Sequence, residues 1–319
     1  MSLKETIRSI KHFLVEDIWT LNMKELSKGK ARLVLDAKVV VNAIRQIGEN
    51  SVGLLSASLC YFCTMAAVPF LAVCFALTGG LGLSEKLTEI MFSNFGPDNA
   101  LINMILNAAD NILATAQSGG FGLISALMFV WLIIWMMDRV EKVFNVVWGV
   151  KKMPRKRYFS YSIDLAIIIL APFVILIFFT GTIVYSHVLD YIMPKGIGFS
   201  DGIKSLLGWV IFGATIVMVF SAMFKFIPSA NVKYKYALKA AILSGIAFTL
   251  LQYLYLETQL LVTRINAVYG TVAAIPLFLL WLRFGWLIIV FGVQFSYSFQ
   301  TIGEQENLSD YPLEANVVS

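Results

Sequence analysis

The chain has 319 residues, of which 58% are hydrophobic and 14% are charged, and its formal net charge is +5. Soluble domains average about 45 to 50% apolar and about 25% charged residues, so this composition excludes a soluble globular protein and predicts a membrane protein. We expect no secretory signal peptide, because residues 1–50 hold nine Lys or Arg and six Asp or Glu around no apolar core.

Six runs are long and apolar enough to span a bilayer as helices. In chain order they cover residues 52–77, 121–137, 165–188, 205–224, 240–262 and 268–299. Lys and Arg divide unevenly between the segments outside these runs. Twenty lie before the first run, between the second and third, and between the fourth and fifth, whereas the alternate segments hold four. By the positive-inside rule, this asymmetry predicts that both termini are cytoplasmic.

The segments outside the spans also carry signals. Residues 1–50 are expected to form cytoplasmic amphipathic helices, one over 3–21 and one over 31–47. An outer helical hairpin is expected over 84–119, and the acidic residues 301–319 are expected to form a disordered cytoplasmic tail. The predicted fold is therefore an all-α, six-helix transmembrane domain over 51–300. Small residues four apart, such as Gly53 with Ala57 and Ala241 with Gly245, predict close helix contacts within the bundle or in a homo-oligomer.

Residues typical of catalysis are scarce. The two histidines, His12 and His187, are far apart, which argues against a zinc site, and no phosphate-binding glycine loop is present. Cys60 and Cys63 match a redox spacing but lie inside an apolar run, where cysteine usually serves as a small packing residue. We therefore expect no catalytic residues, no metal and no cofactor.

A basic cluster follows the second span. It is a candidate contact for anionic lipid headgroups, which attract each nearby basic residue by about 1 kcal/mol. The alternative is that it acts only as a topological signal that keeps the segment inside. The cluster consists of Lys151, Lys152, Arg155, Lys156 and Arg157.

Arg283 is the one charged residue between Ile265 and Gly303. An arginine at the centre of a span costs about 2.5 to 3.5 kcal/mol on insertion scales. At about 100° per residue, Pro276, Arg283 and Gln294 share one helix face. Three interpretations stay open: Arg283 joins helices structurally, it lines a polar path and binds an anion in transit, or it lies on the lipid face. The candidate partners on other spans are Tyr61, Pro69, Gln252 and Glu257, with Pro69 and Gln252 favoured as the nearest neighbours.

Four stretches together carry a resemblance to a known family. They read "ASLCYFCTMAAVPFLAV", "MMDRVEKVFNVVWGVKK", "FKFIPSANVKYKYALKAAILSGIAF" and "INAVYGTVAAIPLFLLWLRFGWLIIVFGVQ". In spacing and hydropathy the chain resembles the YihY/BrkB family of bacterial inner-membrane proteins, from about residue 40 to about residue 300. The resemblance implies six helices with both ends inside, and a proposed role in transport or in the cell envelope.

Two features of the chain depart from the family resemblance. The family's last span usually carries tyrosine or another uncharged polar residue at the position of Arg283, and Gly-Ala-Glu at the positions of Gly292, Val293 and Gln294.

Some members of the family were once named as a ribonuclease, but this chain lacks the metal ligands and acid-base pairs that RNA cleavage requires.

The sequence as a whole favours an inner-membrane transporter or translocase for an anionic solute or a lipid-linked envelope component. Its expected partners are membrane lipids and an anionic substrate, with no nucleic acid. The competing hypothesis is a scaffold that organises lipids or envelope assembly without transport, and a membrane-embedded enzyme comes third.

Overall fold

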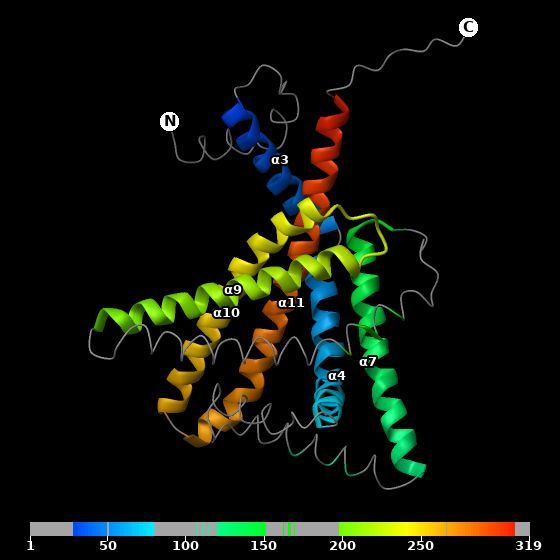
Figure 1. Cartoon of the computed structure of the whole chain (residues 1–319), viewed down its shortest axis with the longest axis vertical. Helices are drawn as coiled ribbons and strands as arrows, with labels where there is room; N and C mark the ends of the chain where they lie inside the picture. Colours follow the sequence, from blue (N-terminus) through cyan, green and yellow to red (C-terminus); the bar gives the residue numbers. More distant parts are fainter. Residues whose placement is uncertain are drawn as a thin grey trace.

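The computed structural model of the chain describes residues 28–49, 51–79, 120–150, 198–265 and 267–309, with a few single positions between them. These residues form helices and turns without a strand, which confirms the predicted all-α class (Figure 1). The helices are α3 (Lys28–Glu49), α4 (Val52–Gly79), α7 (Gly120–Val147), α9 (Gly198–Phe226), α10 (Tyr234–Ile265) and α11 (Ala267–Ser309).

Part of the sequence-based picture lies outside the described residues. The segment 3–21 and the basic cluster at 151–157 belong to this part, as do nearly all of the hairpin 84–119 and of the third span 165–188. The count of six spans and the cytoplasmic termini therefore stay predictions.

Three described stretches are long and apolar enough to cross a membrane: Leu206–Phe226, Tyr234–Gln259 and Ile275–Glu304. They coincide with the fourth, fifth and sixth predicted spans. In α4 the described side chains form an apolar stretch over Val52–Ala67. The second predicted span lies within α7, which continues ten residues further than expected because its charged end packs inside the protein.

Helix α11 contacts each of the other five described helices (Figure 1). Its 43 residues extend over about 65 Å at about 1.5 Å per residue. Helices α3 and α4 follow one another along α11, with a break at Ser51, whose φ is 50°. Helix α10 packs against α11 and α9 packs against α10. The position of α11 therefore sets the positions of all its neighbours.

The core lies where α7, α9 and α10 meet the C-terminal half of α11. Phe144 and Phe224 are fully buried there, with ring centroids 6.4 Å apart. Val290 and Val293 of α11 are equally buried in the same cluster. This end of the bundle thus has a conventional close-packed interior.

Glycines allow two of the helix crossings to be close. A Cβ atom on Gly245 would lie 2.5 Å from the Val217 side chain, so the predicted small-residue contact at Gly245 joins α10 to α9. A Cβ atom on Gly292 would overlap both Ser244 Oγ and the Phe224 ring. At Gly53 no described atom lies within 4 Å of the Cβ position, so the small-residue contact there stays a prediction.

The end of α11 also differs from the expected tail. The helix continues to Ser309 instead of ending near residue 300. Ile302 is buried, and Glu304 forms an ion pair with Lys233 at 3.0 Å. These contacts explain why the first residues of the acidic segment stay helical, since they pack on the start of α10.

The close crossing at Gly292 generates a stability prediction. Replacing Gly292 with Ala should destabilise the protein by about 1 to 3 kcal/mol, because the new methyl group overpacks the junction of α9, α10 and α11. Thermal unfolding in detergent measures the effect. The matched control is Gly208→Ala in α9, where nothing lies within 4 Å of the Cβ position. Equal midpoints for the two variants would contradict the packing at Gly292.

Candidate functional site

Arg283 lies where α11 passes the first turn of α4. Its Nη2 donates a hydrogen bond to the Gly53 carbonyl oxygen at 2.8 Å, and its Nη1 donates to Ser56 Oγ. The Ser56 hydroxyl in turn donates to the Gly53 carbonyl at 3.1 Å, and the Ser56 side chain is fully buried. Among the described residues, the hydrogen-bond partners of Arg283 are therefore neutral oxygen atoms of α4.

Further along α11, a chain of side-chain amides and a hydroxyl joins it to α3. Gln294 Nε2 donates to Gln46 Oε1 at 2.6 Å, and Gln46 Nε2 donates to Asn42 Oδ1 at 3.2 Å. Asn42 Nδ2 then donates back to Ser298 Oγ of α11 at 3.3 Å. Gln294 and Ser298 are both fully buried.

Both groups of contacts join α11 to the pair of helices α3 and α4, which follow one another along α11. Buried polar groups need hydrogen-bond partners, and in a membrane protein the partner must come from the protein wherever water is absent. We call this row the polar seam and define it by Arg283, Ser56, Gln294, Gln46, Asn42 and Ser298.

A second polar group ties the segment between α9 and α10 to the rest of the bundle. Ser229 Oγ donates to Glu141 Oε1 of α7 at 2.7 Å, and the Ser229 backbone N–H donates to Asn145 Oδ1 at 2.7 Å. On the α11 side, Gln300 accepts from the Lys233 N–H at 2.8 Å and donates to the Asn231 carbonyl at 3.0 Å. This segment is therefore held from both sides.

The structure brings together only part of the predicted pathway. Arg283 faces the first span as predicted, but at its first turn, and Pro69 lies 13 residues beyond Ser56, or about 20 Å along the helix. Gln294 faces α3 instead of a spanning helix. The remaining candidates lie elsewhere: Tyr61, Glu257 and Pro276 are exposed and Gln252 is partly buried.

Sequence reasoning missed the partners of Arg283 and Gln294. Ser56 is one of many serines, and nothing in its immediate neighbours distinguishes it. The sequence did contain a sign of polar contacts in the C-terminal half of α11, because polar residues alternate there with apolar ones: Gln294, Ser296, Ser298 and Gln300. All four are buried in the structure. Asn42 and Gln46 lie four residues apart, the spacing of neighbours on one helix face.

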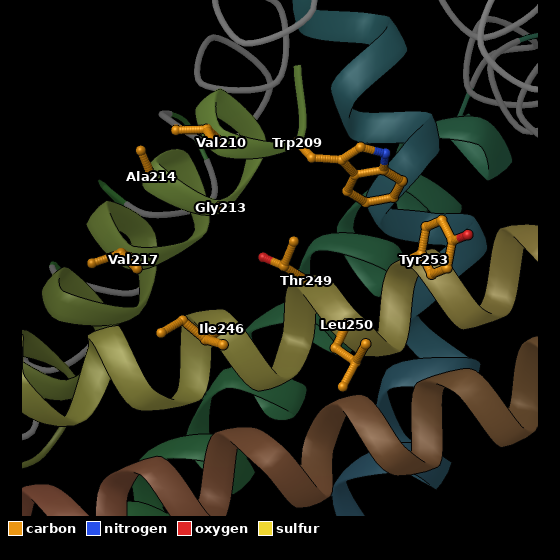
Figure 2. Close-up of a pocket in the computed structure, with 9 residues that line it drawn as sticks. All are labelled: Trp209, Val210, Gly213, Ala214, Val217, Ile246, Thr249, Leu250 and Tyr253. Carbon is orange, nitrogen blue, oxygen red and sulfur yellow. The ribbon is translucent and has the colours of Figure 1, made fainter. Parts of the chain in front are cut away.

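An apolar groove lies between α9 and α10 and has a volume of about 490 Å³. Figure 2 shows its walls, in which only Trp209, Thr249 and Tyr253 carry polar side-chain atoms. The Thr249 hydroxyl donates to the Gly245 carbonyl of its own helix at 2.8 Å, so its hydrogen is already engaged. None of the lining residues belongs to the polar seam. The lining consists of Trp209, Val210, Gly213, Ala214, Val217, Ile246, Thr249, Leu250 and Tyr253.

Within the described residues, no three His, Cys, Asp or Glu side chains form a group that could hold a metal ion. Cys60 and Cys63 are free thiols, and Cys60 Sγ lies 3.8 Å from the Leu279 carbonyl of α11. Both cysteines pack against the core cluster, in agreement with their interpretation as packing residues.

The long apolar helices and the buried polar contacts between them define a multi-pass α-helical membrane protein. Residues 43–315 match the family described as Virulence factor BrkB, so the chain belongs to that family. This finding confirms the resemblance that the four sequence stretches indicated.

Relatives agree with this assignment. The chain is similar to a UPF0761 membrane protein of Haemophilus influenzae, with 24% identity over 82% of this chain and 94% of the relative. It is also similar to a UPF0761 membrane protein of Psychrobacter, with 28% identity over 86% of this chain but only 50% of the relative. The chain is thus a multi-pass bacterial membrane protein. No solved structure matches it.

The contact between Arg283 and Ser56 generates a coupling prediction. Ser56→Ala should destabilise the protein by about 1 to 3 kcal/mol, because a partly buried, charged guanidinium donor loses its acceptor. In a double-mutant cycle with Arg283→Gln, the coupling energy should be about 0.5 to 3 kcal/mol. Thermal unfolding in detergent provides the measurement.

Ser58→Ala is the matched control for this cycle, since Ser58 Oγ donates within α4, to the Leu55 carbonyl at 2.7 Å. Its coupling to Arg283→Gln should stay within about 0.5 kcal/mol of zero. Equal coupling for Ser56 and Ser58 would contradict the direct contact.

Proposed function

We propose that the protein is an inner-membrane transporter or translocase for an anionic solute or a lipid-linked envelope component, and that Arg283 binds the anionic group in transit. The proposal assigns no catalytic activity to the chain. It takes both termini as cytoplasmic, in line with the distribution of Lys and Arg.

The observation that carries the proposal is the incomplete hydrogen bonding of Arg283. A guanidinium has five N–H donors, and two of them are engaged by Gly53 and Ser56. No carboxylate among the described residues pairs with it. A fixed cation with donors to spare inside a spanning helix suits an anion, because charge-assisted hydrogen bonds to carboxylate or phosphate are about twice as strong as neutral ones.

The polar seam supports a route from Arg283 toward the end of the bundle that carries α3. Gln294, Gln46, Asn42 and Ser298 line one helix boundary and are held by hydrogen bonds between uncharged groups. Such bonds contribute about 0.5 to 1.5 kcal/mol each, so the seam can exchange partners with a passing ligand at modest free-energy cost.

The break between α3 and α4 supports a movable wall for this route. Ser51 adopts a φ of 50°, which is uncommon for a residue with a side chain. Rotation about this position would swing α3 away from α11 while α4 stays tied to Arg283. Hinges of this kind, at the ends of helices, are common in proteins that open and close around ligands.

Transport is tested by reconstitution. Arg283→Gln should abolish flux in proteoliposomes while the variant, although less stable because it loses the hydrogen bonds to α4, still inserts and stays folded at the assay temperature. The probes are chloride, inorganic phosphate and a fluorescent short-chain phosphatidylglycerol, whose movement between leaflets is followed by quenching. Arg45→Gln, on the exposed face of α3, removes the same charge outside the seam and should retain flux.

Flux of a transported probe that survives Arg283→Gln would remove Arg283 from the pathway. Absence of flux for every probe in the wild-type protein would favour the scaffold hypothesis instead. In that case, neutralising the basic cluster at Lys151, Lys152, Arg155, Lys156 and Arg157 should impair function in cells more than Arg283→Gln does.

A further inference from the structure

Arg139 of α7 has surroundings quite different from those of Arg283. Its guanidinium carbon lies 5.2 Å from the centre of the Phe62 ring of α4 and 5.3 Å from that of the Trp135 ring. Its Nε is buried and has no hydrogen-bond partner. Within the part of the chain that the structure describes, Arg139 therefore contacts aromatic faces and is not neutralised by an acidic group.

The acidic residues beside Arg139 on α7 are engaged elsewhere. Asp138 forms an ion pair with Lys142 at 2.5 Å. Glu141 is buried and accepts a hydrogen bond from Ser229 at 2.7 Å. The positive charge of Arg139 is thus left for a group from outside the described bundle, and a guanidinium best matches a phosphate or a carboxylate.

Arg139 stands at one end of an apolar track. On one face of α7, Leu127, Trp131 and Trp135 precede it at four-residue steps. The side chains of Leu127 and Trp131 are 62% and 59% exposed. The rings of Trp131 and Trp135 are stacked, with centroids 5.7 Å apart. Phe62 packs edge-on against Trp135 at 5.0 Å, which widens the track onto α4.

Tyr61 completes the surface on the α4 side. It is 61% exposed, and its ring lies 5.6 Å from that of Phe62. The exposed Met65 follows one turn later. Tyr61, which the sequence placed in the polar pathway, thus belongs to this aromatic surface.

The size and direction of the track identify its occupant. From Leu127 to Arg139 the helix rises about 18 Å, close to the depth of one leaflet, which is half of a hydrocarbon core of about 30 Å. Arg139 lies at the end nearer to the predicted cytoplasmic side, where lipid headgroups of the inner leaflet lie. The cation and the apolar track therefore match the phosphate and an acyl chain of one phospholipid.

We propose that Arg139, Phe62, Trp135 and Trp131 form a binding site for an anionic phospholipid of the inner leaflet, with the lipid phosphate on the Arg139 guanidinium and an acyl chain along the tryptophans. The Phe62 and Trp135 rings hold the guanidinium in place, and the Arg139 side chain is only partly buried. This site shares no residue with the polar seam, and it stands whether or not the protein transports an anion.

Native mass spectrometry of the purified full chain tests the site with dioleoyl phosphatidylglycerol as the probe. The wild-type protein should retain this lipid, and Arg139→Gln should weaken its apparent affinity about tenfold, the loss expected when a charged hydrogen bond is removed. Lys235→Gln is the matched control: it removes one exposed positive charge of α10 outside the site and leaves the ion pair between Asp138 and Lys142 intact, so the affinity should stay within about twofold if general attraction is small. A wild-type affinity equal to that of Arg139→Gln, or an equal loss in Lys235→Gln, would overturn the proposal.

Two further variants keep the test valid if Arg139→Gln does not fold. Arg139→Lys retains the charge but not the planar fork, and Phe62→Leu removes one aromatic wall, so both should weaken binding of the same lipid severalfold. Unchanged binding in both variants would overturn the site. Inorganic phosphate at millimolar concentration serves as the competitor: retention of the lipid is expected, whereas its displacement would assign the site to a free anion instead.

Discussion

The two hydrogen bonds from Arg283 to the first turn of α4 fix the register between α11 and the α3–α4 pair. A shift of α11 by one residue would move it about 1.5 Å and turn it about 100°, which would separate Arg283 from Ser56 and Gln294 from Gln46 together. In a membrane these groups have few alternative partners, so the polar contacts specify one arrangement more sharply than apolar packing does. Since α11 contacts every other described helix, this register also sets where α7, α9 and α10 pack.

The two halves of α11 have different roles because their surroundings differ. Near Ile275 and Leu280 the helix is apolar and exposed, as expected for a surface that faces lipid. From Ile289 to Ile302 most of its residues are buried on all sides, and polar residues there are matched by α3 and by the segment that joins α9 to α10. Movement in this protein would be easier at α3 than at α10, since α11 has a less extensive contact with α3 than with α10, and the α10 contact is closely packed at Gly292.

Family membership and the local chemistry answer different questions. Membership in the BrkB family places the chain in a bacterial membrane, and a shared fold does not by itself define an activity. The two membrane arginines supply the chemical detail. Arg283 is held by oxygen acceptors within the bundle, whereas Arg139 is held by aromatic rings at its edge. The first arrangement suits a ligand that passes between helices, and the second suits a lipid that stays at the surface.

The sequence by itself determined the all-α class, the approximate bounds of the long helices and the unusual character of Arg283, because apolar length and isolated charges are local properties of the chain. It also placed Arg283 and Gln294 on one face, which the structure turns toward α4 and α3. Only the tertiary structure decided that Ser56 and Gln46 are the partners, that Tyr61 joins an aromatic surface, and that residues 301–309 remain helical. The two partners lie more than 200 residues away from Arg283 and Gln294 in the sequence. The aromatic surface and the helical residues 301–309 depend on contacts with other helices. Helical periodicity defines the faces of a helix, but the choice of which faces meet is made by packing among all the helices at once.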